Sequence, residues 1–181
     1  MRRWLFAPAV LAALIVGALP AGAQQAGWAP FSSPEGRFSV RLPEPPQHMT
    51  EQESDPRVPT PLTSHTFMSI DGRRHYVVSY VDYPPSFKGE VEIELGASRE
   101  SFVKRVNGKL AGSKRVEYRR GSDVLPAEEF TVTEGDNEHT VLTILDNERP
   151  YQVVAVIPKD EAKEAAADVK AYFESFKITP R

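Results

Sequence analysis

Histidine is the residue type in this chain that most directly suggests metal chemistry, because imidazole nitrogens are common metal ligands. The four histidines are His48, His65, His75 and His139. His65 and His75 lie on either side of Asp71-Gly72, a dipeptide typical of a two-residue hairpin turn. With that turn, His65 would pair with Val78, and His65 and His75 would point to opposite faces of the sheet. The sequence therefore predicts partly exposed sheet histidines, no metal site and no cofactor.

Catalytic groups are equally hard to assemble from the sequence. A hydrolase needs a nucleophile, a base and an orienting acid, and no G-x-S-x-G motif marks an activated serine. The adjacent Glu128 and Glu129 would point to opposite faces of a strand, so they do not converge. The chain has no cysteine, which excludes thiol catalysis, thiolate zinc sites and disulfides. We therefore expect no enzyme activity and assign no catalytic residue.

Two neighbouring segments of the chain carry opposite charge. The first is basic, with Arg99, Lys104, Arg105, Lys109, Lys114, Arg115, Arg119 and Arg120 against Glu100 and Glu117. The second is acidic, with Asp123, Glu128, Glu129, Glu134, Asp136, Glu138, Asp146 and Glu148. The basic segment could bind an acidic partner, or the two segments could pack side by side and neutralise each other. The sequence leaves both interpretations open.

A second basic feature lies at the hairpin, where Arg73 and Arg74 precede Tyr76 and Tyr80. Arginine and tyrosine together are typical of protein interfaces, but Tyr76 and Tyr80 share one face of the strand and are expected to pack in the core. The candidate interaction surface consists of Arg73, Arg74, Lys104, Arg105, Arg115, Arg119 and Arg120.

The N-terminal segment is typical of a signal peptide. Arg2 and Arg3 precede an apolar run, and Ala21-Gly22-Ala23 has the small-residue pattern of a cleavage site. We expect residues 1–23 to be removed after Ala23, and the run is too short to predict a stable membrane span. The protein would then be periplasmic or secreted. Its net charge of −3 gives no reason to expect nucleic-acid binding.

The rest of the chain predicts one α+β domain, 31–181, after a short flexible lead, 24–30. Strands are expected at 38–42, 62–70, 73–83, 114–120, 128–134, 138–146 and 149–158, and helices at about 95–110 and 162–176. The proline-rich segment 43–61 is expected to be an irregular loop. Short connections favour antiparallel neighbours. The economical fold is a single antiparallel sheet flanked by helices.

Four short pieces of the sequence carry a resemblance to a known family. They are Phe31-Ser32-Ser33-Pro34-Glu35-Gly36-Arg37-Phe38-Ser39-Val40-Arg41-Leu42-Pro43, Tyr80-Val81-Asp82-Tyr83-Pro84, Arg149-Pro150-Tyr151-Gln152-Val153 and Phe173-Glu174-Ser175-Phe176-Lys177-Ile178. In this order they resemble secreted bacterial members of the PsbP-like superfamily. The resemblance implies an α/β/α sandwich around an antiparallel sheet. It also implies a non-enzymatic interaction domain, with no functional residue to transfer.

These observations together predict an exported, non-catalytic binding or interaction domain. Its expected partner is an envelope or extracellular protein. The alternative hypothesis is a periplasmic protein that binds a small ligand or a cation in a cleft between helix and sheet.

Overall fold

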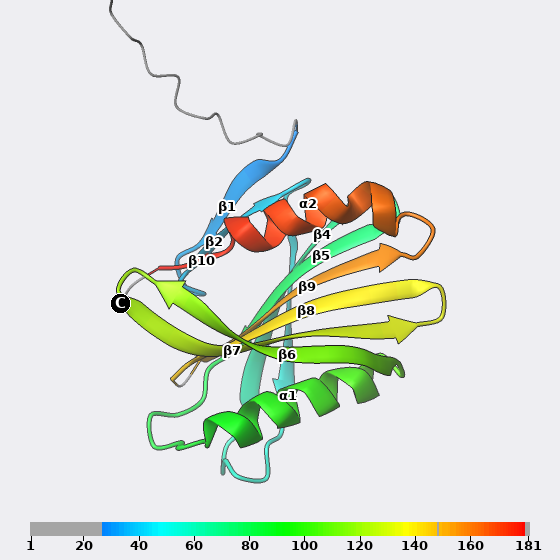
Figure 1. The fold of residues 1–181 in the computed structure, drawn as a ribbon. Helices are drawn as coiled ribbons and strands as arrows, with labels where there is room; N and C mark the ends of the chain where they lie inside the picture. The colour runs from blue at the N-terminus through cyan, green and yellow to red at the C-terminus, as the bar shows by residue number, and fades with distance from the viewer. Residues whose placement is uncertain (1–26, 148, 180–181) are drawn as a thin grey trace, which may run out of the picture.

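The computed structural model describes residues 27–147 and 149–179, so the predicted signal peptide, 1–23, lies outside the described residues. The elements in chain order are β1 (Ala29–Ser33), β2 (Phe38–Leu42), β3 (Gln47–Glu53), β4 (Leu62–Asp71), β5 (Arg74–Val81), α1 (Val91–Arg105), β6 (Lys109–Arg120), β7 (Asp123–Glu134), β8 (Asn137–Asp146), β9 (Arg149–Pro158), α2 (Ala162–Ser175) and β10 (Lys177–Ile178). Figure 1 shows α1 and α2 on opposite sides of a long twisted sheet.

The strands form two antiparallel sheets, so the expectation of a single sheet is wrong. The larger sheet has seven strands in the order β3-β4-β5-β9-β8-β7-β6, and the smaller has the order β1-β2-β10. In the smaller sheet, β10 returns from the end of the chain to pair with β2 near its beginning. Local sequence periodicity reports which side of a strand is buried, but it does not report which distant strand is the partner.

The larger hydrophobic core lies between the seven-stranded sheet, α2 and the small sheet. Its fully buried aromatic side chains are Phe38, Tyr76, Tyr151, Tyr172 and Phe176. The prediction of core burial for Tyr76 and Tyr80 is confirmed, since only 0% and 3% of these residues is exposed.

The opposite face of the seven-stranded sheet has a smaller core beneath α1. It consists of Phe102, Phe130, Val132, Val141 and Val154. The helix contacts β7 and β8, and only Leu95 and Phe102 among its residues are buried. Helix α1 therefore packs mainly on β7 and β8 rather than on β4 and β5.

The segment 43–61, predicted to be an irregular loop, contains the strand β3, so the prediction is wrong for Gln47–Glu53. All seven residues of β3 are exposed, and they pair with β4 at the edge of the sheet. An edge strand with both faces exposed lacks the apolar alternation that identifies a half-buried strand. Its backbone hydrogen bonds to β4, rather than side-chain burial, hold it in place.

The flexible lead predicted at 24–30 is also wrong in its described part. Trp28 is buried and packs edge-to-face against Tyr76, with ring centroids 4.7 Å apart, and β1 begins at Ala29. A single tryptophan in a short polar segment has no periodic pattern that would predict this contact.

Helix α1 ends at Arg105, earlier than the expected Leu110. Asn107 has φ 51°, in the left-handed region that ends helices, and it is followed by Gly108. A Cβ on Gly108 would lie 2.4 Å from Val132 Cγ1, so glycine is required where the chain enters β6.

The β4–β5 hairpin turns one residue later than the sequence predicted. Asp71 pairs with Arg74 across a Gly72-Arg73 turn, and His65 pairs with Tyr80 instead of Val78. The shift preserves the alternation of faces, so His65 and His75 still point to opposite faces.

No helix among the described residues is long and apolar enough to cross a membrane.

Candidate binding cleft beneath α1

A row of polar side chains crosses the face of the seven-stranded sheet that carries α1. The strand register aligns Thr66, Ser79, Gln152, Thr143 and Glu128 on five consecutive strands, from β4 to β7. Because cross-strand partners point to the same face, these five side chains form one continuous line. We call this line the polar row.

One neighbouring row on the same face is almost entirely apolar. It consists of Met68, Val77, Val154, Val141 and Phe130. Its members from β9, β8 and β7 belong to the core beneath α1, and Val77 of β5 packs against that core. The polar row therefore interrupts a surface that would otherwise form a continuous core.

A cleft of about 870 Å³ lies over the polar row between α1 and the sheet. One wall is α1, which contributes Glu94, Ala97, Ser98, Ser101 and Arg105. These positions fall at i, i+3, i+4, i+7 and i+11, the spacing of one helix face. The floor includes Thr66, Ser79 and Gln152, and the segments 53–57 and 87–89 close the end of the cleft beside them. We call this feature the α1 cleft.

One end of the polar row is bound to α1 by hydrogen bonds. Gln152 Nε2 donates to Ser98 Oγ at 2.8 Å, and the hydroxyls of Ser98 and Thr143 lie 3.3 Å apart. Glu128, only 3% exposed, is hydrogen bonded by Arg99 of α1. A buried carboxylate needs such a partner to offset the loss of its hydration. These contacts position the helix over the sheet.

The other end of the polar row lies open in the cleft. Within 27–147 and 149–179, the side-chain hydroxyls of Thr66 and Ser79 have no hydrogen-bond partner, and both residues are partly exposed. The same holds for the hydroxyl of Ser101 on the helix wall. These hydroxyls are uncharged groups that can donate and accept hydrogen bonds, and they are available to a ligand in the cleft.

An arginine connects the loop after β3 to the helix wall of the cleft. Arg57 binds Asp55 at 2.6 Å and Glu94 of α1 at 2.5 Å, and its guanidinium lies 4.9 Å from the centre of the Phe87 ring. Hydrogen bonding from Arg57 lowers the pKa of Asp55 to about 2. We call Asp55, Arg57 and Glu94 the Arg57 clasp, because these three residues join the 54–61 loop to α1.

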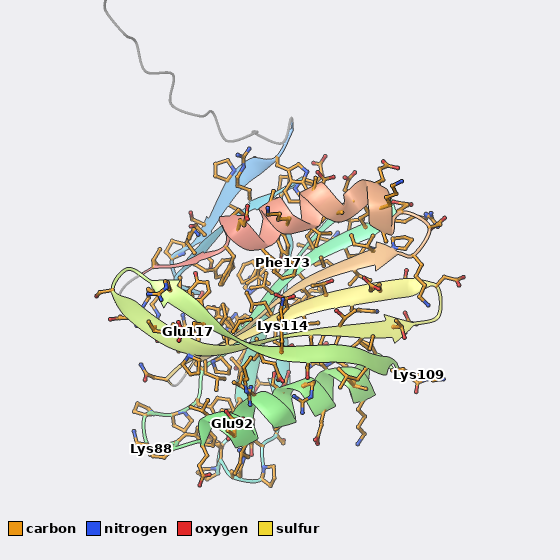
Figure 2. The ribbon with its side chains drawn as sticks, viewed as in Figure 1. Lys88, Glu92, Lys109, Lys114, Glu117 and Phe173 are labelled. Atoms are coloured by element: carbon orange, nitrogen blue, oxygen red, sulfur yellow. The ribbon has the colours of Figure 1, made fainter. Side chains whose placement is uncertain are left out.

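The residues of the predicted interaction surface do not form one patch. Arg73, in the β4–β5 turn, and Arg74, at the start of β5, bind acidic residues at and just before the N-terminus of α2: Asp160, Glu161 and Glu164. The others lie on α1 and β6, on another part of the molecule. Two further basic residues, Lys109 and Lys114, also lie on β6. Figure 2 shows them spread along this strand, above Glu92 of α1.

Most of these basic side chains are engaged in ion pairs within the chain. Arg115 binds Glu92 and lies 3.7 Å from Glu128, Arg120 binds Asp123 and Asp146, and Arg119 lies 3.4 Å from Glu117. In the described part of the chain, Lys104 and Arg105 have no ion-pair partner. An interaction surface there remains a prediction, and the mutual neutralisation of the two segments accounts for much of the charge pattern.

Neither the polar row nor the Arg57 clasp was predicted from the sequence. The signal for the row was a polar residue between two apolar residues of the same face, as in Val77-Ser79-Val81 and Val141-Thr143-Leu145. Such single interruptions are common in strands, and only the register shows that they align. Arg57 lies in a segment expected to be irregular, where no pattern predicts a partner on a helix more than thirty residues away.

No protein-family model and no curated protein matches the sequence. Among solved structures, the solution structure of cyanobacterial PsbP (CyanoP) from Synechocystis sp. PCC 6803 is similar to this chain, with a TM-score of 0.58 over 90% of this chain and 98% of CyanoP. The chain has a PsbP-like fold. This confirms the PsbP-like fold that the four sequence pieces implied. The two sequences are 11% identical, so the PsbP-like fold is what the similarity shows.

Proposed function

We propose that this chain is an exported, non-catalytic binding protein that holds a segment of a partner protein in the α1 cleft. The observation that carries the proposal is the open end of the polar row, where Thr66 and Ser79 present hydroxyls without protein partners. Polar groups in a concave site that the protein leaves unpaired are available to a ligand.

The chemistry of the cleft supports binding rather than catalysis. None of the four histidines lines it. The Tyr83 hydroxyl donates to Asp55 Oδ2 at 3.1 Å, but that carboxylate is already bound by Arg57 and is a weak base. The carboxylates of Asp55 and Glu94 are held by Arg57. The PsbP-like fold is consistent with a non-enzymatic role.

The uncharged floor indicates how a partner segment would be recognised. Backbone amides of an extended segment could hydrogen bond to the hydroxyls of Thr66, Ser79 and Ser101. Because these hydroxyls carry no charge, their contribution to binding should depend only weakly on salt. A partner bound by the basic residues of β6 would instead dissociate as salt increases. The partner expected from the predicted export is an envelope or extracellular protein.

Site-specific photo-cross-linking tests the proposal. A benzophenone amino acid at Ser101, in the cleft wall, should cross-link one partner in the native host at both low and high salt. The matched control is Glu100, which is exposed on the same helix but lies outside the cleft lining. Equal cross-linking from both positions, or cross-linking from Glu100 alone, would contradict the proposal.

A second measurement uses the partner once it is cross-linked. Thr66→Val and Ser79→Ala remove the two free hydroxyls with little change in volume. Each should weaken binding about two- to tenfold, as expected for the loss of one neutral hydrogen bond of about 0.5–1.5 kcal/mol. Undiminished affinity in the double variant would exclude the polar row as the recognition element.

A further inference from the structure

Two histidines lie next to each other on the sheet face opposite the α1 cleft. His48 of β3 pairs with Phe67, and His65 of β4 pairs with Thr50, so the two histidines are diagonal neighbours on one face. His48 Nε2 and His65 Nδ1 are hydrogen bonded at 3.2 Å, with the tautomers deciding which nitrogen donates, so a metal ion bound by both would replace this shared proton. Thr66, in the cleft, follows His65 in β4 and points to the other face. The histidine pair and the cleft are therefore separate sites.

Both imidazoles stack on buried aromatic rings. His48 stacks on Phe67, with ring centroids 4.2 Å apart and an interplanar angle of 3°, and His65 stacks on Tyr80 at 4.7 Å and 8°. Phe67 and Tyr80 belong to the larger core and are 7% and 3% exposed. The two imidazoles are thus supported from below by rings that cannot easily move.

The two imidazoles lie edge to edge, with nitrogen facing nitrogen. Their planes differ by 16° and their centroids are 5.4 Å apart. Because the two facing nitrogens are much closer together than the centroids, the rings meet at their edges and do not overlap face to face. His48 is exposed and His65 is partly exposed, so solvent and ions can reach the pair.

The spacing of the two nitrogens suits coordination of a metal ion. Histidine nitrogens bind Zn²⁺ at about 2.0–2.1 Å, which places two nitrogens of a tetrahedral site about 3.3 Å apart. The observed 3.2 Å is close to this value. A bound ion lies to one side of the N···N line, so each ring must tilt about χ2, a broad torsion for histidine.

We propose that His48 and His65 form a surface site for a divalent transition-metal cation. Imidazole suits Cu²⁺, Ni²⁺ and Zn²⁺, and the usual order of stability puts Cu²⁺ first. Among the described residues no group of three metal-ligating side chains occurs, so water fills the remaining positions. The ion would therefore exchange readily and would tie the edge strand β3 to β4.

Calorimetry on the protein purified without a polyhistidine tag tests this site, using Cu²⁺, Zn²⁺ and Mg²⁺ as separate probes. We expect binding in the order Cu²⁺ then Zn²⁺, and none of Mg²⁺, which prefers oxygen ligands. His48→Gln and His65→Gln should each weaken Cu²⁺ binding at least about tenfold, the scale seen when support for a metal site is lost. The matched control is His75→Gln, on the same sheet but facing the other way, which should leave binding unchanged.

A second readout locates the ion independently of affinity. Bound Cu²⁺ is paramagnetic and should broaden the NMR signals of the Phe67 and Tyr80 rings before those of Phe102, which lies beneath α1. His48 is exposed, so His48→Gln should melt like the original protein without metal. Equal Cu²⁺ affinity in the original protein and both variants, or the same loss in His75→Gln, would overturn the proposal.

Discussion

Phe176 lies where α2, the small sheet and the seven-stranded sheet meet. Its ring is fully buried and packs against Phe38, Tyr118 and Tyr151. Phe173 and Phe176 are three residues apart in the sequence, a spacing that in a helix would place both rings on one face against the sheet. The structure shows Phe173 only partly buried, at the edge of the contact.

This difference predicts unequal costs for the two alanine substitutions. Phe176→Ala should reduce the free energy of unfolding by about 3–5 kcal/mol, because it leaves a cavity in a closed core. Phe173→Ala should cost clearly less, since part of its ring already contacts water. Urea denaturation of both variants measures the two losses in free energy of unfolding. Equal losses would show that α2 is rotated from its position in this structure.

His139 is a buried histidine on the α1 side of the sheet. It is 7% exposed, and neither ring nitrogen has a hydrogen-bond partner among the described residues; the Glu134 carboxylate lies 3.6 Å away. Burial lowers the pKa of His139 below its usual 6.5, with Glu134 partly opposing the shift. The folded protein therefore favours the neutral imidazole.

A pH dependence of stability follows from this shift. Below about pH 6.5 the unfolded chain binds a proton at His139 that the folded protein does not, so the free energy of unfolding falls as pH decreases toward the folded pKa. The slope from one proton is at most about 1.4 kcal/mol per pH unit. His139→Leu should remove this component in urea titrations from pH 7.5 to 5, whereas His48→Gln should retain it. If the free energy of unfolding of His139→Leu changed with pH in parallel with that of the original protein, this role of His139 would be excluded.

Among the secondary-structure elements, β6 explains much of the charge pattern. It is an edge strand of twelve residues, and its outer backbone groups have no partner strand among the described residues. Lysine and arginine on an edge strand discourage pairing with another chain. Lys114 also binds Glu129 on β7, at 2.9 Å, so the acidic strand neutralises the basic one locally.

The 54–61 loop depends on the Arg57 clasp for its attachment to α1. Arg57→Gln should increase amide hydrogen exchange in this loop, most visibly at Val58, whose N–H donates to the Asp55 carbonyl at 2.9 Å. Arg73→Gln is the control, because Arg73 forms exposed ion pairs elsewhere. Unchanged exchange in the loop would show that the clasp does not hold it.

The clasp should also resist acid. The pKa of Asp55 is about 2 in the folded protein, below its usual 3.8, so the contribution of this carboxylate is present above pH 3.8 and is lost only as pH falls through about 2. The protection of the loop amides, measured relative to the exchange rate of an unfolded chain at the same pH, should therefore be as high at pH 4 as at pH 7.

In the molecule as a whole, the small sheet joins the two ends of the domain. Ile178 of β10 pairs with Phe38 of β2, and its N–H donates to the Tyr118 hydroxyl of β6 at 3.0 Å. This one residue therefore contacts the N-terminal sheet and the edge of the larger sheet.

Replacing Ile178 should weaken the entire domain. Ile178 is 4% exposed, and Ile178→Ala should cost about 2–5 kcal/mol of the free energy of unfolding. Lys177→Ala, one residue earlier and exposed, should cost little. A single cooperative melting transition at lower temperature is the expected result, and a separate early transition would mean that the small sheet unfolds on its own.

The two faces of the seven-stranded sheet differ in packing. The face beneath α2 and the small sheet holds most of the large aromatic residues, whereas the α1 face holds a small core and the α1 cleft. Regions with few buried apolar contacts open at lower free energy than the core. We therefore expect a partner to be admitted on the α1 side without loss of the fold.

The sequence by itself determined which segments are regular and which sides of them are buried. It predicted β2, β9 and α2 almost to the residue, the opposite orientation of Glu128 and Glu129, and the burial of Tyr76 and Tyr80. Each of these depends on local periodicity, which a chain shows wherever one side of an element is covered.

Only the tertiary structure decided which strands are neighbours and in what register. β3, exposed on both faces, left no periodic signal, and so the meeting of His48 with His65 could not be predicted. The polar row exists because separate strands pair with one alignment, and the small sheet exists because β10 returns to β2. These features arise from contacts between residues far apart in the chain, whose geometry no short stretch of sequence contains.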